Sequence, residues 1–148
     1  MSFKSIVGRR IGLKSTGNLV AKGGDLAITQ PCVDASITVG DESTNVRAIT
    51  IQLKDANGAD IAYVENVEII VYASAAMTAY ASTGGSTGLA IGTDGALLAV
   101  VAKKYFLATS ESDGDIDLTW TDTGTESVAV GVRLPNGRVV VTDAFANA

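Results

Sequence analysis

The chain has 148 residues, 47% of them hydrophobic and 18% charged, which excludes wholesale disorder and provides enough apolar side chains for the core of one domain. It contains no histidine and a single cysteine, so an intrachain disulfide and a cysteine zinc site are excluded and the usual general base of a hydrolytic enzyme is missing. We therefore expect no enzymatic activity, no cofactor and no metal.

Residues 1–45 differ in character from the rest of the chain. Short apolar pieces alternate there with glycine, serine, threonine and basic residues, and none is long enough to form its own core. Residues 1–30 carry five basic side chains and one acidic one, a net charge of +4, whereas residues 31–148 carry six basic and fifteen acidic side chains, a net charge of −9. An ordinary solvated terminus would have a similar composition. The charge asymmetry nevertheless favours an extended basic arm that binds an acidic surface through Lys4, Arg9, Arg10, Lys14 and Lys22.

Residues 46–148 are typical of short strands joined by tight turns. Between the turns, apolar and polar side chains alternate, as in the stretches that begin at Ile49, Val67, Ile116 and Val128, and this alternation places Trp120 on an apolar face. Asparagine and aspartate tolerate a positive φ and glycine adopts it freely, which hairpin turns require. Such pairs stand at Asn57-Gly58, Asp94-Gly95, Asp113-Gly114 and Asn136-Gly137.

Two stretches in this part of the chain are ambiguous. Residues 97–108 could form a helix by propensity, but their β-branched and aromatic residues favour a strand. Residues 73–81 are rich in alanine and lead into the glycine-rich stretch 82–88, for which we predict an irregular, flexible loop. The pattern predicts six or seven strands from Val46 onward, and two facing sheets are the natural way to bury several one-sided strands.

Few residues in this sequence suggest a chemical site. Asp113, Asp115 and Asp117 have the spacing that begins a calcium loop, but Leu118 and Gly124 stand where that loop needs glycine and glutamate. We therefore interpret these carboxylates as a solvated strand face, with a weak cation site near Glu111, Asp113 and Asp122 as the alternative. Cys32 is predicted to be a small buried hydrophobe, and the pair Lys103-Lys104 to be solubilising edge residues.

Three pieces of the chain between Ile49 and Phe145 resemble the small immunoglobulin-like domains of tailed-bacteriophage virion proteins. These are "ITIQLKDANGADIA", "ATSESDGDIDLTW" and "VAVGVRLPNGRVVVTDAF", which look like an opening hairpin, a strand entry and a closing hairpin of such domains. The resemblance implies an all-β, immunoglobulin-like β-sandwich over residues 46–148. Residues 1–45 match no motif of that family, and their composition alone predicts the extended arm.

The same resemblance implies a role in the virion rather than in catalysis. A single small domain with an arm fits a capsid decoration (cement) protein, which would bind and stabilise the outer surface of the head. A tail or fibre module, and an adhesin module that binds host-surface glycans, are the alternatives. The partners implied are the major capsid protein and further copies of the chain, as a trimer or dimer on the capsid lattice. We expect a soluble protein made in the host cytoplasm, with no membrane partner, and the acidic body disfavours nucleic acid.

Overall fold

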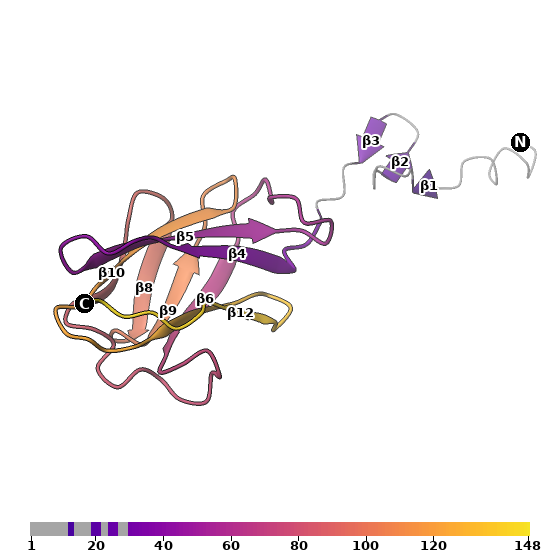
Figure 1. The fold of residues 1–148 in the computed structure, drawn as a ribbon. Coiled ribbons are helices and arrows are strands. Elements are labelled where there is room, and N and C mark those ends of the chain that lie inside the picture. Colours follow the sequence, from indigo (N-terminus) through magenta and orange to yellow (C-terminus); the bar gives the residue numbers. More distant parts are fainter. Residues whose placement is uncertain (1–11, 14–18, 22–23, 27–29) are drawn as a thin grey trace, which may run out of the picture. The chain divides into compact units, whose positions relative to one another are not determined.

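The structure, a computed structural model, describes residues 12–13, 19–21, 24–26 and 30–148 (Figure 1). The chain forms two compact units, Met1–Gln30 and Pro31–Ala148. In the first unit the described strands make a three-stranded antiparallel sheet of β1 (Gly12–Leu13), β2 (Leu19–Ala21) and β3 (Gly24–Leu26). The five basic residues predicted to bind a partner, Lys4, Arg9, Arg10, Lys14 and Lys22, lie outside the described residues.

The second unit is an all-β sandwich of the immunoglobulin-like kind, which confirms the predicted fold class. Its first sheet contains four antiparallel strands, in the order β4 (Asp34–Val39), β5 (Val46–Lys54), β10 (Asp115–Thr121), β7 (Gly88–Ile91). Its second sheet contains five, in the order β12 (Val139–Val141), β11 (Ala129–Arg133), β6 (Asn66–Tyr72), β9 (Tyr105–Thr109), β8 (Ala96–Val101). In the part of the chain that the structure describes, no helix could span a membrane.

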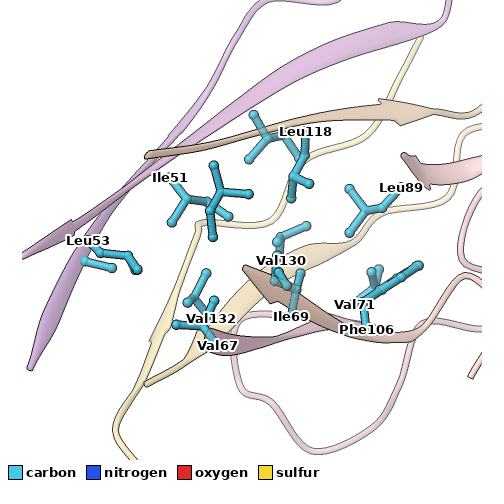
Figure 2. Packing of buried hydrophobic residues seen from close by; sticks show 14 of the residues in the cluster. Ile51, Leu53, Val67, Ile69, Val71, Leu89, Phe106, Leu118, Val130 and Val132 are labelled. Atoms are coloured by element: carbon cyan, nitrogen blue, oxygen red, sulfur yellow. The ribbon is translucent and has the colours of Figure 1, made fainter. Parts of the chain in front are cut away.

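The core lies between the two sheets and is almost entirely aliphatic (Figure 2). Ile51 and Leu118 point inward from the four-stranded sheet, and Ile69 and Val130 point inward from the five-stranded sheet. Along β5 and β10, alternation of side chains puts apolar residues on the inner face and mostly polar residues on the outer face. Few aromatic residues are needed because β-branched side chains fill the space between two sheets efficiently.

Trp120 is the largest side chain in this core and is completely buried, as its place in the alternating pattern of β10 predicts. Its ring meets that of Phe145 edge to face, with the ring centroids 6.2 Å apart. Gly85 lies directly against the same indole, since a Cβ built on Gly85 would stand 2.8 Å from the Trp120 ring. Gly85 also has a φ of +81°, so both the backbone conformation and the close approach require glycine.

The predicted Asx-Gly turns are confirmed by the backbone, because the glycine of each pair has a positive φ. The turn at Asn136-Gly137 closes the hairpin of β11 and β12 as predicted, whereas the turns at Asp94-Gly95 and Asp113-Gly114 each connect a strand of one sheet to a strand of the other. The turn at Gly114 is the most constrained, since an added Cβ would approach Ile61 Cγ1 to 2.5 Å. That glycine is therefore required by packing as well as by its φ of +82°.

Three details of the predicted organisation differ from the structure. The compact unit begins at Pro31 and not at residue 46, because β4 pairs with β5 from Asp34 to Val39 and completes the four-stranded sheet. Eight strands follow residue 45, where six or seven were predicted. The extra strand comes from residues 97–108, which divide between β8 and β9 because the chain turns at Lys103, a residue with a positive φ.

Candidate docking surface

The outer surface of the five-stranded sheet carries large apolar side chains that remain exposed. Leu98, Val101 and Leu107 are exposed by 65%, 44% and 45% respectively. All three belong to the hairpin of β8 and β9, and β8 is an edge strand without a charged residue between Ala96 and Val101. Edge strands of free proteins usually carry charges that prevent association, so this hairpin has the composition of a surface that another molecule covers.

Strand register places outward side chains of this sheet in rows, and two adjacent rows at its centre together make up what we name the outer sheet face; the rows that flank them contain Asn66 and Thr109 on one side and Tyr72 on the other. Cross-strand pairing gives the first row from β8 to β12 as Leu98, Leu107, Glu68, Arg133 and Val139. The second row, one pleat further along, is Val101, Tyr105, Ile70, Gly131 and Val141. Most members of both rows are apolar, so the face is a continuous apolar surface with one acidic and one basic group inside it.

The two charged residues of the outer sheet face form an ion pair. Arg133 Nη1 lies 3.2 Å from Glu68 Oε2, and the two side chains are exposed by 53% and 31%. The Glu68 carboxylate also accepts a hydrogen bond from the Tyr105 hydroxyl, which raises the pKa of Tyr105 because the bond favours the protonated phenol. As it stands the ion pair is solvated and contributes little to stability, so both charges remain available to a partner.

A groove of about 400 Å³ lies at one end of this face, beside the first row. Its floor is formed by β6 and its walls by β9 on one side and by the turn after β11 on the other. The groove is lined by apolar groups and by the ion pair: Asn66, Val67, Glu68, Leu107, Ala108, Arg133, Leu134, Pro135 and Gly137. A concave apolar surface with a few polar groups at its centre is typical of a binding site.

The second cluster of functional groups is acidic and lies on the four-stranded sheet. Asp94, Asp115 and Asp117 each offer a carboxylate oxygen, and these oxygens lie within 4.8 Å of one another. Burial, reinforced by the neighbouring Asp117, raises the pKa of Asp115, whose Oδ1 is buried and has no donor among the described residues. Both oxygens of Asp117 already accept hydrogen bonds, from the hydroxyls of Thr50 and Thr93. These are the carboxylates that could hold a cation, and the expectation of no metal remains a prediction.

The alternative cation site predicted near Glu111, Asp113 and Asp122 is wrong. Asp113 and Asp122 lie beyond opposite ends of β10, which alone spans roughly 20 Å at the usual rise of a strand. Asp122 is instead buried, and its carboxylate accepts hydrogen bonds from the backbone N–H groups of Ser86, Gly124 and Glu126. Asp122 therefore holds the loop after β10 against Ser86 and is not available to bind a cation near Asp113.

The glycine-rich stretch 82–88 is held by charged side chains and is not the open, flexible loop that its composition predicts. The Glu126 carboxylate accepts hydrogen bonds from the backbone N–H groups of Thr83, Gly84 and Gly85, at 2.9, 3.0 and 3.1 Å, and from the Thr83 hydroxyl. Burial alone would raise the pKa of Glu126, but the bonds from Thr83 and Gly85 outweigh it and lower the pKa to about 2.

Two lysines hold the same loop from its carbonyl side. Lys103 Nζ donates to the carbonyl oxygens of Gly85 and Ser86, at 3.2 and 2.6 Å, and Lys104 Nζ donates to that of Ser82 at 2.8 Å. The prediction that these lysines are only solubilising edge residues is therefore wrong. The prediction for Cys32 is confirmed, since its side chain is buried and its pKa is raised, mainly by that burial.

Sequence reasoning missed the outer sheet face. An unbroken apolar run such as Ala96–Val101 usually indicates a strand buried on both sides, and it was interpreted only as a strand. The sequence did offer one signal: no charged residue stands between Asp94 and Lys103, although this strand directly follows a tight turn.

Comparisons with known proteins give no family for this chain. No protein family matches its sequence, and no curated protein does. Among solved structures, it is similar to a cohesin module from a family 33 glycoside hydrolase of Clostridium perfringens, at 14% identity and a TM-score of 0.41. That similarity covers 80% of this chain and 95% of the cohesin module.

Proposed function

We propose that this chain is a non-enzymatic structural protein of a tailed-phage virion that decorates the outer surface of the head. One observation carries the proposal: the unit Met1–Gln30 has a net charge of +4, and the sandwich Pro31–Ala148 has a net charge of −9. A small sandwich with a tightly packed aliphatic core is suited to reinforcement, and a basic segment that precedes it in the chain is suited to attachment. The resemblance of residues 49–145 to virion domains supports the viral setting.

In this proposal the basic segment binds carboxylates on the major capsid protein. Lys4, Arg9, Arg10, Lys14 and Lys22 supply the charge, and the acidic sandwich is repelled from the same surface, so the molecule binds in one orientation. Each attachment is weak and screened by salt, but copies bound side by side on a symmetric shell strengthen one another.

The alternative of a glycan-binding adhesin is less well supported by the aromatic residues. Sugars are commonly bound by exposed aromatic rings, and Trp120 is completely buried in the core. Tyr80 is exposed by 51% and is the aromatic residue most available for such contacts. Binding to host cells in place of heads would favour this alternative.

We expect the full chain to bind purified heads that lack this protein, and we expect binding to be lost when the five basic residues of residues 1–30 are replaced by glutamine. The measurement is co-sedimentation with heads at 50 and 300 mM salt. At low salt the affinity should fall at least about tenfold in the variant, because attraction between charges provides much of the attachment. Binding of the unaltered chain should also weaken at the higher salt.

Two controls make this result specific. Neutralising Lys54 and Arg138, two basic residues of the sandwich, should leave binding unchanged. Deleting residues 1–30 should have the same effect as the five replacements, with the far-UV spectrum of the sandwich preserved. Binding by the truncated protein as tight as that of the full chain would place the attachment on the sandwich and overturn the proposal.

A further inference from the structure

We propose that the outer sheet face binds the same face of a second copy, around a two-fold axis that runs along the strands between β6 and β11. No other part of the sandwich covers Leu107, which is exposed by 45%, or the Arg133 side chain, which is exposed by 53%. The occupant is indicated by the order of charges along the first row. This contact differs from attachment to the head, since it uses none of residues 1–30.

The first row is complementary to itself when its direction is reversed. From β9 to β12 it reads Leu107, Glu68, Arg133, Val139, which is apolar, acidic, basic, apolar. Neighbouring strands are evenly spaced, about 4.8 Å apart. A two-fold axis between β6 and β11 therefore places each residue of the row opposite the residue of the second copy that lies at the same distance on the other side of the axis. Leu107 then faces Val139 of the second copy, and Glu68 faces Arg133 of the second copy.

The second row fits the same axis. Tyr105 faces Val141 of the second copy, and Ile70 faces Gly131, beside which the Tyr72 ring already lies. This row contains no charged residue, and no like charges meet in either row. A two-fold contact of this kind is isologous, because each copy contributes the same surface.

Charge also explains why a second copy fits better than a strongly charged partner. The sandwich has a net charge of −9, but Glu68 and Arg133 cancel within the two rows of the described face. Three of the acidic residues, Asp94, Asp115 and Asp117, cluster at the four-stranded sheet, so they point away from the contact. Two copies can therefore meet through a neutral apolar face despite their like net charges.

Leu107 and Tyr105 of β9, and not the free edge of β8, take part in this contact, and Leu98 and Val101 of β8 have no counterpart in the second copy. The register between β8 and β9 shifts between Ala99 and Val101, an irregularity that blunts an edge for pairing with another strand. The groove between Leu107 and Pro135 is open at one end of the face, where it can receive side chains of the second copy.

The test is the mass of the full chain in solution, measured by sedimentation from 1 to 500 µM. The monomer mass is 15.1 kDa, and we expect a reversible shift to twice that value as concentration rises. Glu68→Arg and Arg133→Glu each place like charges opposite one another, so each should weaken the dimer at least about tenfold. The double variant restores opposite charges both within and between chains and should dimerise nearly as well as the original protein.

Two further variants keep the test decisive. Leu107→Glu changes an exposed residue of the face and should give a monomer, which covers the case in which a change at Glu68 disturbs folding. Exchanging the charges of Lys54 and Asp60, the exposed ion pair of another surface, should leave the dimer unchanged. A monomer at every concentration, a trimer, a dimer unaffected by Leu107→Glu, or a double variant that stays monomeric would each overturn the proposal.

Discussion

Replacing Trp120 with alanine should lower the free energy of unfolding by about 3 to 5 kcal/mol, the cost of deleting a large aromatic side chain from a packed core. The indole is completely buried, packs edge to face on Phe145 and lies under Gly85, so the cavity cannot be filled by a small shift of neighbours. Denaturant unfolding followed by circular dichroism measures the effect. A domain of this size has a total stability of about 5 to 15 kcal/mol, so the variant should be close to unfolding.

A matched pair of variants separates the cavity from the loss of the indole N–H. Trp120→Phe keeps most of the ring and removes an N–H that meets no acceptor among the described residues, so its cost should be clearly smaller. Tyr80→Ala removes an exposed ring and should change stability by less than about 0.5 kcal/mol. A cost below about 1 kcal/mol for Trp120→Ala would show that the core is not organised around this residue.

Replacing Glu126 with alanine should be nearly as costly, at about 2 to 3 kcal/mol. The change leaves three backbone N–H groups and the Thr83 hydroxyl without their acceptor, and hydrogen bonds to a charged group are the stronger kind. The loop they hold also covers Trp120 through Gly85, so its release exposes part of the core. Glu126→Gln keeps an acceptor oxygen and should be intermediate.

The same carboxylate should make stability depend on pH. Its pKa falls from 4.5 to about 2 on folding, so its contribution is fully present above pH 4.5 and is lost as the pH falls through 2. Unfolding measured between pH 7 and pH 2 should therefore show a loss of about 2 kcal/mol or more in the original protein that is absent in Glu126→Ala. Parallel pH profiles for the two proteins would contradict the role assigned to Glu126.

The features that the sequence predicts well are local. Alternation along β5 and β10 gives the buried face directly, since Ile49, Ile51, Ile116 and Leu118 recur at every second position. The Asx-Gly turns are equally local, because the requirement for a positive φ falls on one residue of each pair. Strand β4 also has a local signal, since Ala35, Ile37 and Val39 stand at every second position, but its place after the basic segment makes this short stretch part of the predicted arm.

The features that the sequence does not predict depend on residues far apart along the chain. Glu126 holds Thr83 across 43 positions, and Lys103 holds Gly85 across 18, so composition alone makes the loop look unrestrained. The outer sheet face likewise exists only once β8, β9, β6, β11 and β12 lie side by side. The order of Leu107, Glu68, Arg133 and Val139 cannot be obtained without the strand register.

The most direct measurement of the proposed function is the position of this protein in the virus particle. The proposal assigns the chain to a tailed phage, whose particles would be labelled with an antibody to the sandwich and imaged by electron cryomicroscopy, with particles lacking the protein as the control. The account predicts label over the outer surface of the head, repeated with the symmetry of the shell, and additional density at those positions that is absent from the control. Label confined to the tail or its fibres, or no label on intact particles, would contradict it.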